Sequence, residues 1–291
     1  MKRLVLLLLN LLMPMILFAA SNDLCFRHFS VEDGLSSNSV RALMQDKYGF
    51  LWIGTDEGLN RYDGTTVKLY RLKDRGANEA ISSLYSTLNK IWIGTDEGIY
   101  IYDYETEDIM PFVLATSKNI HIETNTNHIV EDKDKNLWFT TVGQGIFKYN
   151  TITNHLEQYE FKNANGLMAS VLVENQIWAI TNWGNSGLFK LNKAENKFET
   201  FPLSYESGKH DSNALVMLED SEHTLWLGTW ECGLQKIDKY SGKATTYLHP
   251  TDGKGATHIH SIMEYAPHQL LIGSDDGLLL FNTITEEYQL F

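Results

Sequence analysis

Two tryptophan residues stand in segments that differ from the repeated pattern around them, and an indole ring can bind a sugar. Trp183 belongs to "TNWGNSG" at 181–187, and Trp230 belongs to "TWECG" at 229–233. An exposed indole stacks on the apolar face of a sugar ring, while nearby polar groups bind its hydroxyls. The alternative is that each ring packs onto a neighbouring loop. We treat both as candidate ligand-binding residues.

Polar residues that can hydrogen-bond to hydroxyl groups precede several β-rich segments. Arg41, Asn127 and His260 stand at equivalent positions when the sequence is aligned on its repeated core. Such side chains bind hydroxyls, but they equally well satisfy the backbone of their own loops. The candidate ligand-binding residues are therefore Trp183, Trp230, Arg41, Asn127, His128, Asn213, His258 and His260.

Metal binding has little support in these residues. His258 and His260 share a face if they lie on one strand, but no third ligand is evident. The segment "DKDKN" at 132–136 begins like a calcium loop, yet Leu137 replaces the required Gly and no Glu stands at the twelfth position. We expect neither a metal nor a cofactor.

Catalysis also lacks a clear signature. A carboxylate clamp needs several Arg from different parts of a fold, but all six Arg occur at or before Arg75. Glycoside hydrolysis needs two opposed carboxyl groups, and the sequence singles out no such pair. The sequence therefore predicts no enzyme and no catalytic residues. Two alternatives stay open: a polysaccharide lyase or glycosidase, with a histidine as base in the lyase, and a protein-interaction scaffold.

The N-terminus is typical of a secretory signal peptide. Basic "MKR" precedes apolar "LVLLLLNLLMPMILF", and "AAS" at 19–21 offers small residues for cleavage. An uncleaved anchor helix is the alternative, which Asn10 and Pro14 weaken. We expect a signal peptide over 1–21, a domain over 22–291 and a periplasmic location.

The chain is acidic, which limits its partners. Its formal charge of −13 becomes −15 once Lys2 and Arg3 are removed. This charge repels polyanions, so we expect no nucleic acid partner and favour neutral ligands. Cys25 and Cys232 could form one disulfide in an oxidising compartment, but their spacing does not demand it, and two free thiols are favoured.

A repeat of 40–48 residues organises the chain from about residue 30 onwards. "LWIGTDEGL" at 51–59 returns as "IWIGTDEGI" at 91–99. The core positions of the six copies are Trp52, Trp92, Trp138, Trp178, Trp226 and Leu271. A Gly and then an apolar run ending in Asp or Asn follow each of them. Such a period indicates a repeat architecture.

Each copy predicts four antiparallel strands. In the first copy, "VRALMQD", "LWIGT", "LNRYD" and "TVKLYRL" are strand-like, and turn residues separate them. Four hairpin-connected strands per 40–45 residues match a blade of a β-propeller, and "LWIGT" is apolar on both faces because blades pack face to face. We expect the repeated tryptophans to fill the space between blades. Asp46, Asp132 and Asp220, each six residues before a tryptophan, should cap turn amides.

The phrase "GLSSNSVRALMQDKYGFLWIGTDEGLNRYDG" at 34–64 resembles the two-component regulator propeller repeat. Later copies agree at the core with drift, such as "GQG" for "DEG" at 143–145. The resemblance implies the extracytoplasmic sensor part of a hybrid two-component regulator, which binds oligosaccharide to control glycan-use genes. It also implies a homodimer in the full-length sensor.

The same resemblance raises an expectation of incompleteness. Members of the family continue into a β-sandwich, a membrane helix, a histidine kinase and DNA-binding parts, so contact with a membrane would come only through missing C-terminal parts. "CFRHF" at 25–29 resembles a fourth strand. We therefore expect an all-β, incomplete seven-bladed propeller, with six full blades and one extra N-terminal outer strand, in a truncated member of the family. An open blade face would then be exposed.

Overall fold

The computed structural model describes residues 24, 26–72, 79–114, 120–161, 166–183, 187–205, 213–249, 256 and 258–291. These residues form the short 3₁₀ helix η2 (Val31–Asp33) and the strands β1 to β25. The segment expected to be a signal peptide lies outside them. Among the described residues, no helix has the length and apolar content needed to cross a membrane.

The strands form six antiparallel sheets, which we call blades 1 to 6. Blade 1 contains β1 (Val40–Gln45), β2 (Leu51–Thr55), β3 (Gly58–Tyr62) and β4 (Val67–Tyr70). Blade 2 contains β5 (Ile81–Ser86), β6 (Lys90–Thr95), β7 (Gly98–Asp103) and β8 (Asp108–Pro111). Blade 3 contains β9 (Thr126–Glu131), β10 (Asn136–Thr141), β11 (Gly145–Asn150) and β12 (His155–Tyr159).

The second half of the chain repeats this plan. Blade 4 contains β13 (Gly166–Val173), β14 (Gln176–Trp183), β15 (Gly187–Asn192) and β16 (Lys197–Phe201). Blade 5 contains β18 (Ala214–Glu219), β19 (Leu225–Thr229), β20 (Leu234–Ile237) and β21 (Lys243–Tyr247), with β17 (Ser204–Tyr205) added beside β21. Blade 6 contains β22 (Ile259–Ala266), β23 (Gln269–Ser274), β24 (Gly277–Asn282) and β25 (Tyr288–Leu290).

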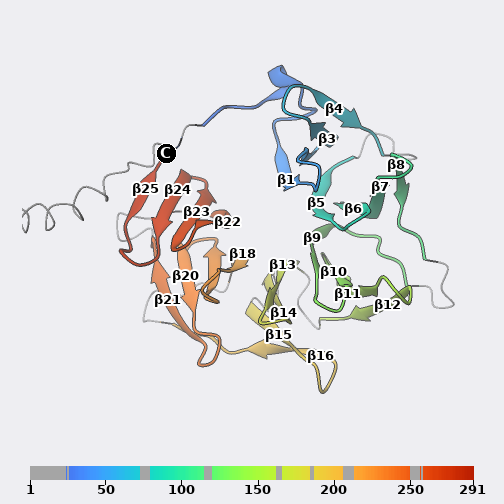
Figure 1. Ribbon diagram of the computed structural model, residues 1–291. Coiled ribbons are helices and arrows are strands. Elements are labelled where there is room, and N and C mark those ends of the chain that lie inside the picture. Colours follow the sequence, from blue (N-terminus) through green and yellow to red (C-terminus); the bar gives the residue numbers. More distant parts are fainter. Residues whose placement is uncertain are drawn as a thin grey trace, which may run out of the picture.

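The blades are arranged around a common centre, with the first strand of each blade innermost (Figure 1). Successive inner strands pack side by side in the order β1, β5, β9, β13, β18, β22. Among the described residues, no comparable contact joins β22 back to β1. The predicted all-β propeller of four-stranded blades is therefore confirmed, with six blades and one opening between blades 6 and 1.

The second strand is buried on both faces in blades 1 to 5. The core tryptophans of blades 1 to 5 are at most 4% exposed. Their strand also contains a glycine for a steric reason. A Cβ on Gly54 would lie 2.6 Å from Ile81 of the next blade, so only a residue without a side chain lets the blades approach this closely.

The turns between the first and second strands follow the predicted Asp pattern. Asp46 accepts hydrogen bonds from the backbone N–H groups of Tyr48 (2.9 Å) and Phe50 (3.0 Å), as expected for a turn cap. Its other oxygen accepts the indole N–H of Trp52 at 2.7 Å, which the sequence did not predict. Asp132 and Asp220 bind Trp138 and Trp226 in the same way.

The extra N-terminal strand predicted at 25–29 is wrong for the residues that the structure describes. Residues 26–30 form no strand. Phe26 instead packs on Phe291 of the last blade, and Phe29 packs on Tyr62 of blade 1. A strand needs a neighbouring strand for its hydrogen bonds, and the structure offers this segment none. The segment crosses between the two blades as an extended connection (Figure 1).

Blade 6 has one face that nothing covers within the described chain. In β23 only Leu270 and Ile272, which face blade 5, are buried, and Leu271 between them is half-buried. Met263, directly opposite Leu271 on β22, is 53% exposed. The expectation of an exposed blade face is therefore confirmed here, although the structure does not show that a seventh blade belongs there.

Of the two cysteines, the structure describes only Cys232, which is buried in the turn after β19. Cys25 lies outside the described residues, so the preference for two free thiols stays a prediction.

Candidate functional site

A β-bulge near the start of each inner strand presents the candidate residues. In β1 the pairing with β2 shifts between Val40 and Ala42, so Arg41 is the extra residue. The same shift in blades 3 and 6 leaves Asn127 and His260 as extra residues. The equivalence predicted for Arg41, Asn127 and His260 is therefore confirmed. Bulges often redirect a side chain at a binding site.

The bulge residues lie beside the turns that join second and third strands. A meander brings these turns and the start of each first strand to the same end of a blade. We call this end the candidate face. Its bulge positions are polar in blades 6, 1, 2 and 3 and apolar in blades 4 and 5: His260, Arg41, Ser82 and Asn127, then Met168 and Leu215.

Four side chains gather on the candidate face where blades 5 and 6 meet, and we call them the Trp230 cluster: Trp230, His258, His260 and Asp275. The imidazole of His258 lies 4.0 Å from the Trp230 ring, centroid to centroid, at an interplanar angle of 41°. Trp230 remains 42% exposed. The Trp230 ring is thus partly open to solvent, while its contact with His258 holds it in position.

Asp275 connects the two histidines. Its carboxylate oxygens lie 2.5 Å from Nδ1 of His258 and 2.8 Å from Nε2 of His260. Hydrogen bonds from His258 and then His260 lower the pKa of Asp275, so its carboxylate is ionised. These ring nitrogens are occupied by Asp275, which leaves the indole face and the outer edges of the cluster for a ligand.

The backbone of the cluster is held by its neighbours. His258 donates its N–H to the carbonyl of Trp230 (3.1 Å), and Trp230 donates to the carbonyl of Asn213 (3.0 Å). His258 has a positive φ of 47°, a conformation that costs free energy and that occurs more often at binding sites. The structure thus brings four predicted residues together: Trp230, Asn213, His258 and His260.

Arg41 lies in a second group on the same face, and its charge is compensated there. Its Nε forms an ion pair with Asp56 of its own blade, and its Nη1 lies 3.5 Å from Asp96 of blade 2. Asn125 donates a further hydrogen bond to Asp96. Arg41 pairs with Asp56 as His260 pairs with Asp275, because each bulge residue meets the turn Asp of its own blade.

The remaining candidate residues belong to blades 3 and 4 and lie outside the Trp230 cluster. Asn127 is half-buried on β9. Nδ1 of His128 is buried without a hydrogen-bond partner, and burial lowers the pKa of His128 to about 4, so the ring is neutral. Trp183 ends β14, but its side chain is outside the part that the structure describes.

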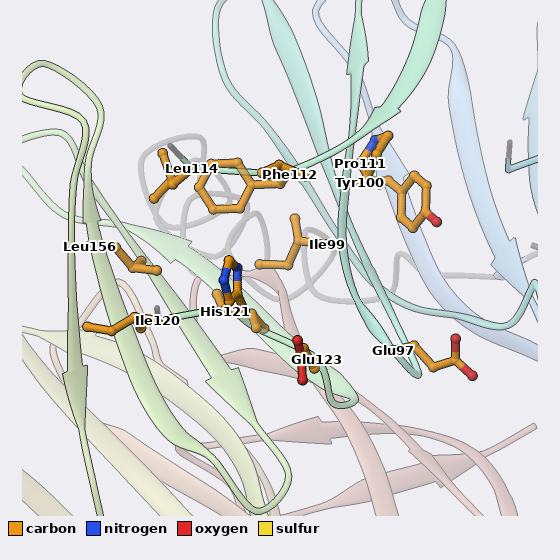
Figure 2. A pocket seen from close by; sticks show the side chains of 12 residues that line it. Glu97, Ile99, Tyr100, Pro111, Phe112, Leu114, Ile120, His121, Glu123 and Leu156 are labelled. Carbon is orange, nitrogen blue, oxygen red and sulfur yellow. The ribbon is translucent and has the colours of Figure 1, made fainter. Parts of the chain in front are cut away.

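A separate cavity of about 200 Å³ lies between blades 2 and 3 (Figure 2). Ile99, Phe112 and Leu156 form its apolar wall, and the carboxylates of Glu97 and Glu123 lie at its edge. No sequence-predicted residue lines it, so it does not extend the Trp230 cluster.

Sequence reasoning missed Asp275, Asp96 and Asp56. Each is the Asp that follows the small polar residue ending the second strand, so its sequence context indicates only a turn. The sequence did, however, contain a pattern that predicts these contacts. An Arg or His at the bulge position and an Asp in the turn of the same repeat predict contact between the two.

Comparisons with known proteins bear on the repeat and on the fold of the chain. Residues 34–57 match the family model described as "Two component regulator propeller". The match covers one repeat, so it shows that residues 34–57 form a repeat of the two-component regulator propeller type. A segment of 53 residues is 49% identical to "Histidine kinase P4" of Formosa agariphila, and it covers 18% of this chain and 4% of that protein.

Solved structures show the same propeller fold. The extracellular domain of the putative hybrid two-component system BT3049 from B. thetaiotaomicron superposes with a TM-score of 0.76, at 21% identity over 91% of this chain and 36% of that one. The extracellular domain of the putative one-component system BT4673 from the same organism gives 0.71, at 23% identity over 88% of this chain and 33% of that one. The chain thus spans about a third of the length of those two chains.

Proposed function

We propose that this propeller is an extracytoplasmic sensor domain of a hybrid two-component regulator and that it binds a neutral oligosaccharide at the Trp230 cluster. The observation that carries the proposal is the exposed indole of Trp230, held by His258 beside the carboxylate of Asp275. A sugar ring stacks on such a surface, and a carboxylate accepts hydrogen bonds from its hydroxyls.

The charges of the candidate face favour a neutral ligand. Arg41 is already paired with Asp56 and Asp96, so it does not offer a free cation to an anionic sugar. Asp275 adds negative charge at the cluster. An anionic glycan would therefore be repelled at short range as well as by the net charge of the chain.

In this proposal, the chain acts in the periplasm, and ligand binding is transmitted by rearrangement between paired sensor chains to distant kinase and DNA-binding parts. The two-component regulator propeller repeat at residues 34–57 and the 53-residue similarity to a histidine kinase support this role. The solved structures themselves support only the fold, because their sequence identity is low.

The test is calorimetric titration of the chain with a panel of neutral and anionic oligosaccharides. We expect a neutral member to bind and Trp230→Ala to weaken binding at least about fivefold, since stacking contributes roughly 1–3 kcal/mol. Tyr240→Ala is the matched control, because Tyr240 is an 81% exposed aromatic residue in the β20–β21 turn at the opposite end of the blade. Equal loss in both variants, or binding only of anionic sugars, would overturn the proposal.

Product analysis in the same titration separates a receptor from an enzyme. The histidine–carboxylate contacts at Asp275 resemble those that orient a general base. Cleavage of any bound sugar would contradict the sensor proposal and support a lyase or hydrolase instead.

A further inference from the structure

Blade 2 lacks the carboxylate that the core tryptophan meets in blades 1, 3 and 5. In blades 1, 3 and 5 the indole N–H donates to an Asp carboxylate at 2.7–2.8 Å. Trp92 of blade 2 is 4% exposed, and its indole N–H has no hydrogen-bond partner. A buried donor without an acceptor costs about 1–3 kcal/mol, so this site gains if an acceptor arrives.

The acceptor is missing because the turn before Trp92 is shorter. Asp46 donates its backbone N–H to Phe50 across the turn of blade 1, and Thr87 donates to Lys90 in the same place in blade 2. Thr87 therefore occupies the Asp position. Its hydroxyl donates to the carbonyl of Lys90 (3.1 Å) rather than meeting the indole.

A second polar partner of the tryptophan is also replaced in blade 2. Arg61, Lys148, Lys190 and Lys236 place a cation 4.9–5.8 Å from the core indole of their own blades. The residue opposite Trp92 on β7 is Ile101. The surroundings of Trp92 are thus apolar where blades 1, 3 and 5 have an acid and a base.

A groove of about 850 Å³ opens beside this tryptophan, between blades 2 and 3. Its walls include Trp92, Ile101 and Phe112, and the exposed side chains of Leu88 and Ile152 stand at its mouth. The Thr87–Lys90 and Thr151–Asn154 turns border it, at the end of the blades opposite to the candidate face. It is distinct from the cavity in Figure 2, although Phe112, Val113 and Leu114 contribute to both.

The charged residues of the groove favour an anion. Lys90, Lys135 and Glu131 line it, which gives a local excess of one positive charge in a chain whose formal net charge is −13. Glu131 is already paired with Lys135 at 3.2 Å. An anionic group that enters here meets the ammonium group of Lys90 and the unpaired indole N–H.

We propose that this groove binds a small apolar molecule that ends in a carboxylate, such as a fatty or aromatic acid. The apolar body lies on Leu88, Ile101 and Phe112, and one carboxylate oxygen accepts the indole N–H of Trp92, as an Asp does in three other blades. Because the N–H is covered in the free chain, side chains at the floor of the groove shift when the acid enters. This site is independent of the sugar site.

The test is a titration of the full chain with sodium decanoate below its micelle concentration, followed by calorimetry and by the indole N–H resonances in a ¹⁵N-labelled sample. We expect one decanoate per chain and a downfield shift of the Trp92 resonance, which Trp92→Phe assigns. Thr87→Asp supplies an internal acceptor and a competing charge, so it should weaken binding at least about tenfold.

Asn89→Asp is the matched control, because it adds the same charge to the same turn without replacing Thr87. Its effect should stay below about threefold, as for an exposed charge. Decanol tests the carboxylate and should bind at least about tenfold more weakly. No binding to the unmodified chain, equal binding by Thr87→Asp, equal binding of decanol, or an unmoved Trp92 resonance would each overturn the proposal.

Discussion

Blades 5 and 6 share one strand plan, but the same position has opposite surroundings in the two. Trp226 in blade 5 is 1% exposed, bonds to Asp220 at 2.7 Å and lies under the ammonium of Lys236. Its counterpart Leu271 is half-buried, beside exposed Met263. Every residue of β19 is buried, whereas burial alternates along the start of β23.

The difference teaches that a blade's second strand is buried by its neighbours. Blade 5 has a blade on each face, and blade 6 has one only on the side of blade 5. A strand that is apolar on both faces is therefore necessary but not sufficient for a closed interface. Substitutions at equivalent positions in the two blades measure how much stability the neighbour contributes.

The largest effect should come from the core position itself. Trp226→Ala removes a fully buried indole between blades 5 and 6 and should lower the free energy of unfolding by about 3–5 kcal/mol. Leu271→Ala removes a half-exposed side chain, so its cost should be about 1 kcal/mol. Urea unfolding followed by circular dichroism checks both, and equal costs would contradict the comparison.

The next largest effect should come from the Asp that supports the indole. Asp220 accepts hydrogen bonds from Trp226 and from the backbone N–H groups of Glu222 and Thr224. Asp220→Ala leaves a buried donor unpaired and should cost about 2–3 kcal/mol, measured as a shift of the urea midpoint. Ser221→Ala, one residue further in the same turn, provides the control, and a similar cost there would argue against the indole bond.

A smaller difference in stability is expected between alanine substitutions at two equivalent glycines, Gly228 in β19 and Gly273 in β23. A Cβ on Gly228 would lie 2.5 Å from Ile259 of the next blade, whereas on Gly273 its close neighbour is the hydroxyl of Ser261, at 2.5 Å on the same sheet. Gly228→Ala should therefore destabilise the chain by about 1–2 kcal/mol, because the blades are forced apart. Gly273→Ala should cost less, and thermal unfolding of the pair decides between the two results.

The smallest effect should be the pH dependence of the Asp275 contacts at the junction of the two blades. Hydrogen bonds lower the pKa of Asp275 from its ordinary value of 3.8. Its contribution to stability is therefore complete above that value and disappears as the pH falls through the lower pKa of the folded chain. A carboxyl titration by NMR should show the lowered pKa, and His258→Ala should raise it towards 3.8. An unchanged titration would mean that the contact is not formed.

The sequence was sufficient for the blades because each one repeats the same local signals. The period, the turn glycines and the strand apolar on both faces all recur, and the six sheets follow them. The equivalence of Arg41, Asn127 and His260 was also predictable. Residues at the same position of a sequence repeat occupy the same position in each blade, and these three are the bulge residues of their inner strands.

What the sequence could not supply was the partner of each side chain. Asp275 looks like any turn residue until the bulge brings His260 towards it. The segment at 26–29 has strand-forming residues, but it lacks a neighbouring strand, and its secondary structure therefore depends on distant parts of the chain. The two-residue strand β17 depends in the same way on its parallel contact with β21.

The uncovered face of blade 6 makes the ring behave as a linear array with a terminal unit. In such an array, each unit is held by its own stability and by the interfaces with its neighbours, so a unit with one interface opens first. In the part of the chain that the structure describes, blades 1 and 6 each have one blade neighbour, so fraying should begin at these two sheets and proceed towards the middle of the chain. His260 on β22, part of the proposed sugar site, would be among the first residues to lose its order, and a ligand that bridges Trp230 and His260 would hold blade 6 to blade 5.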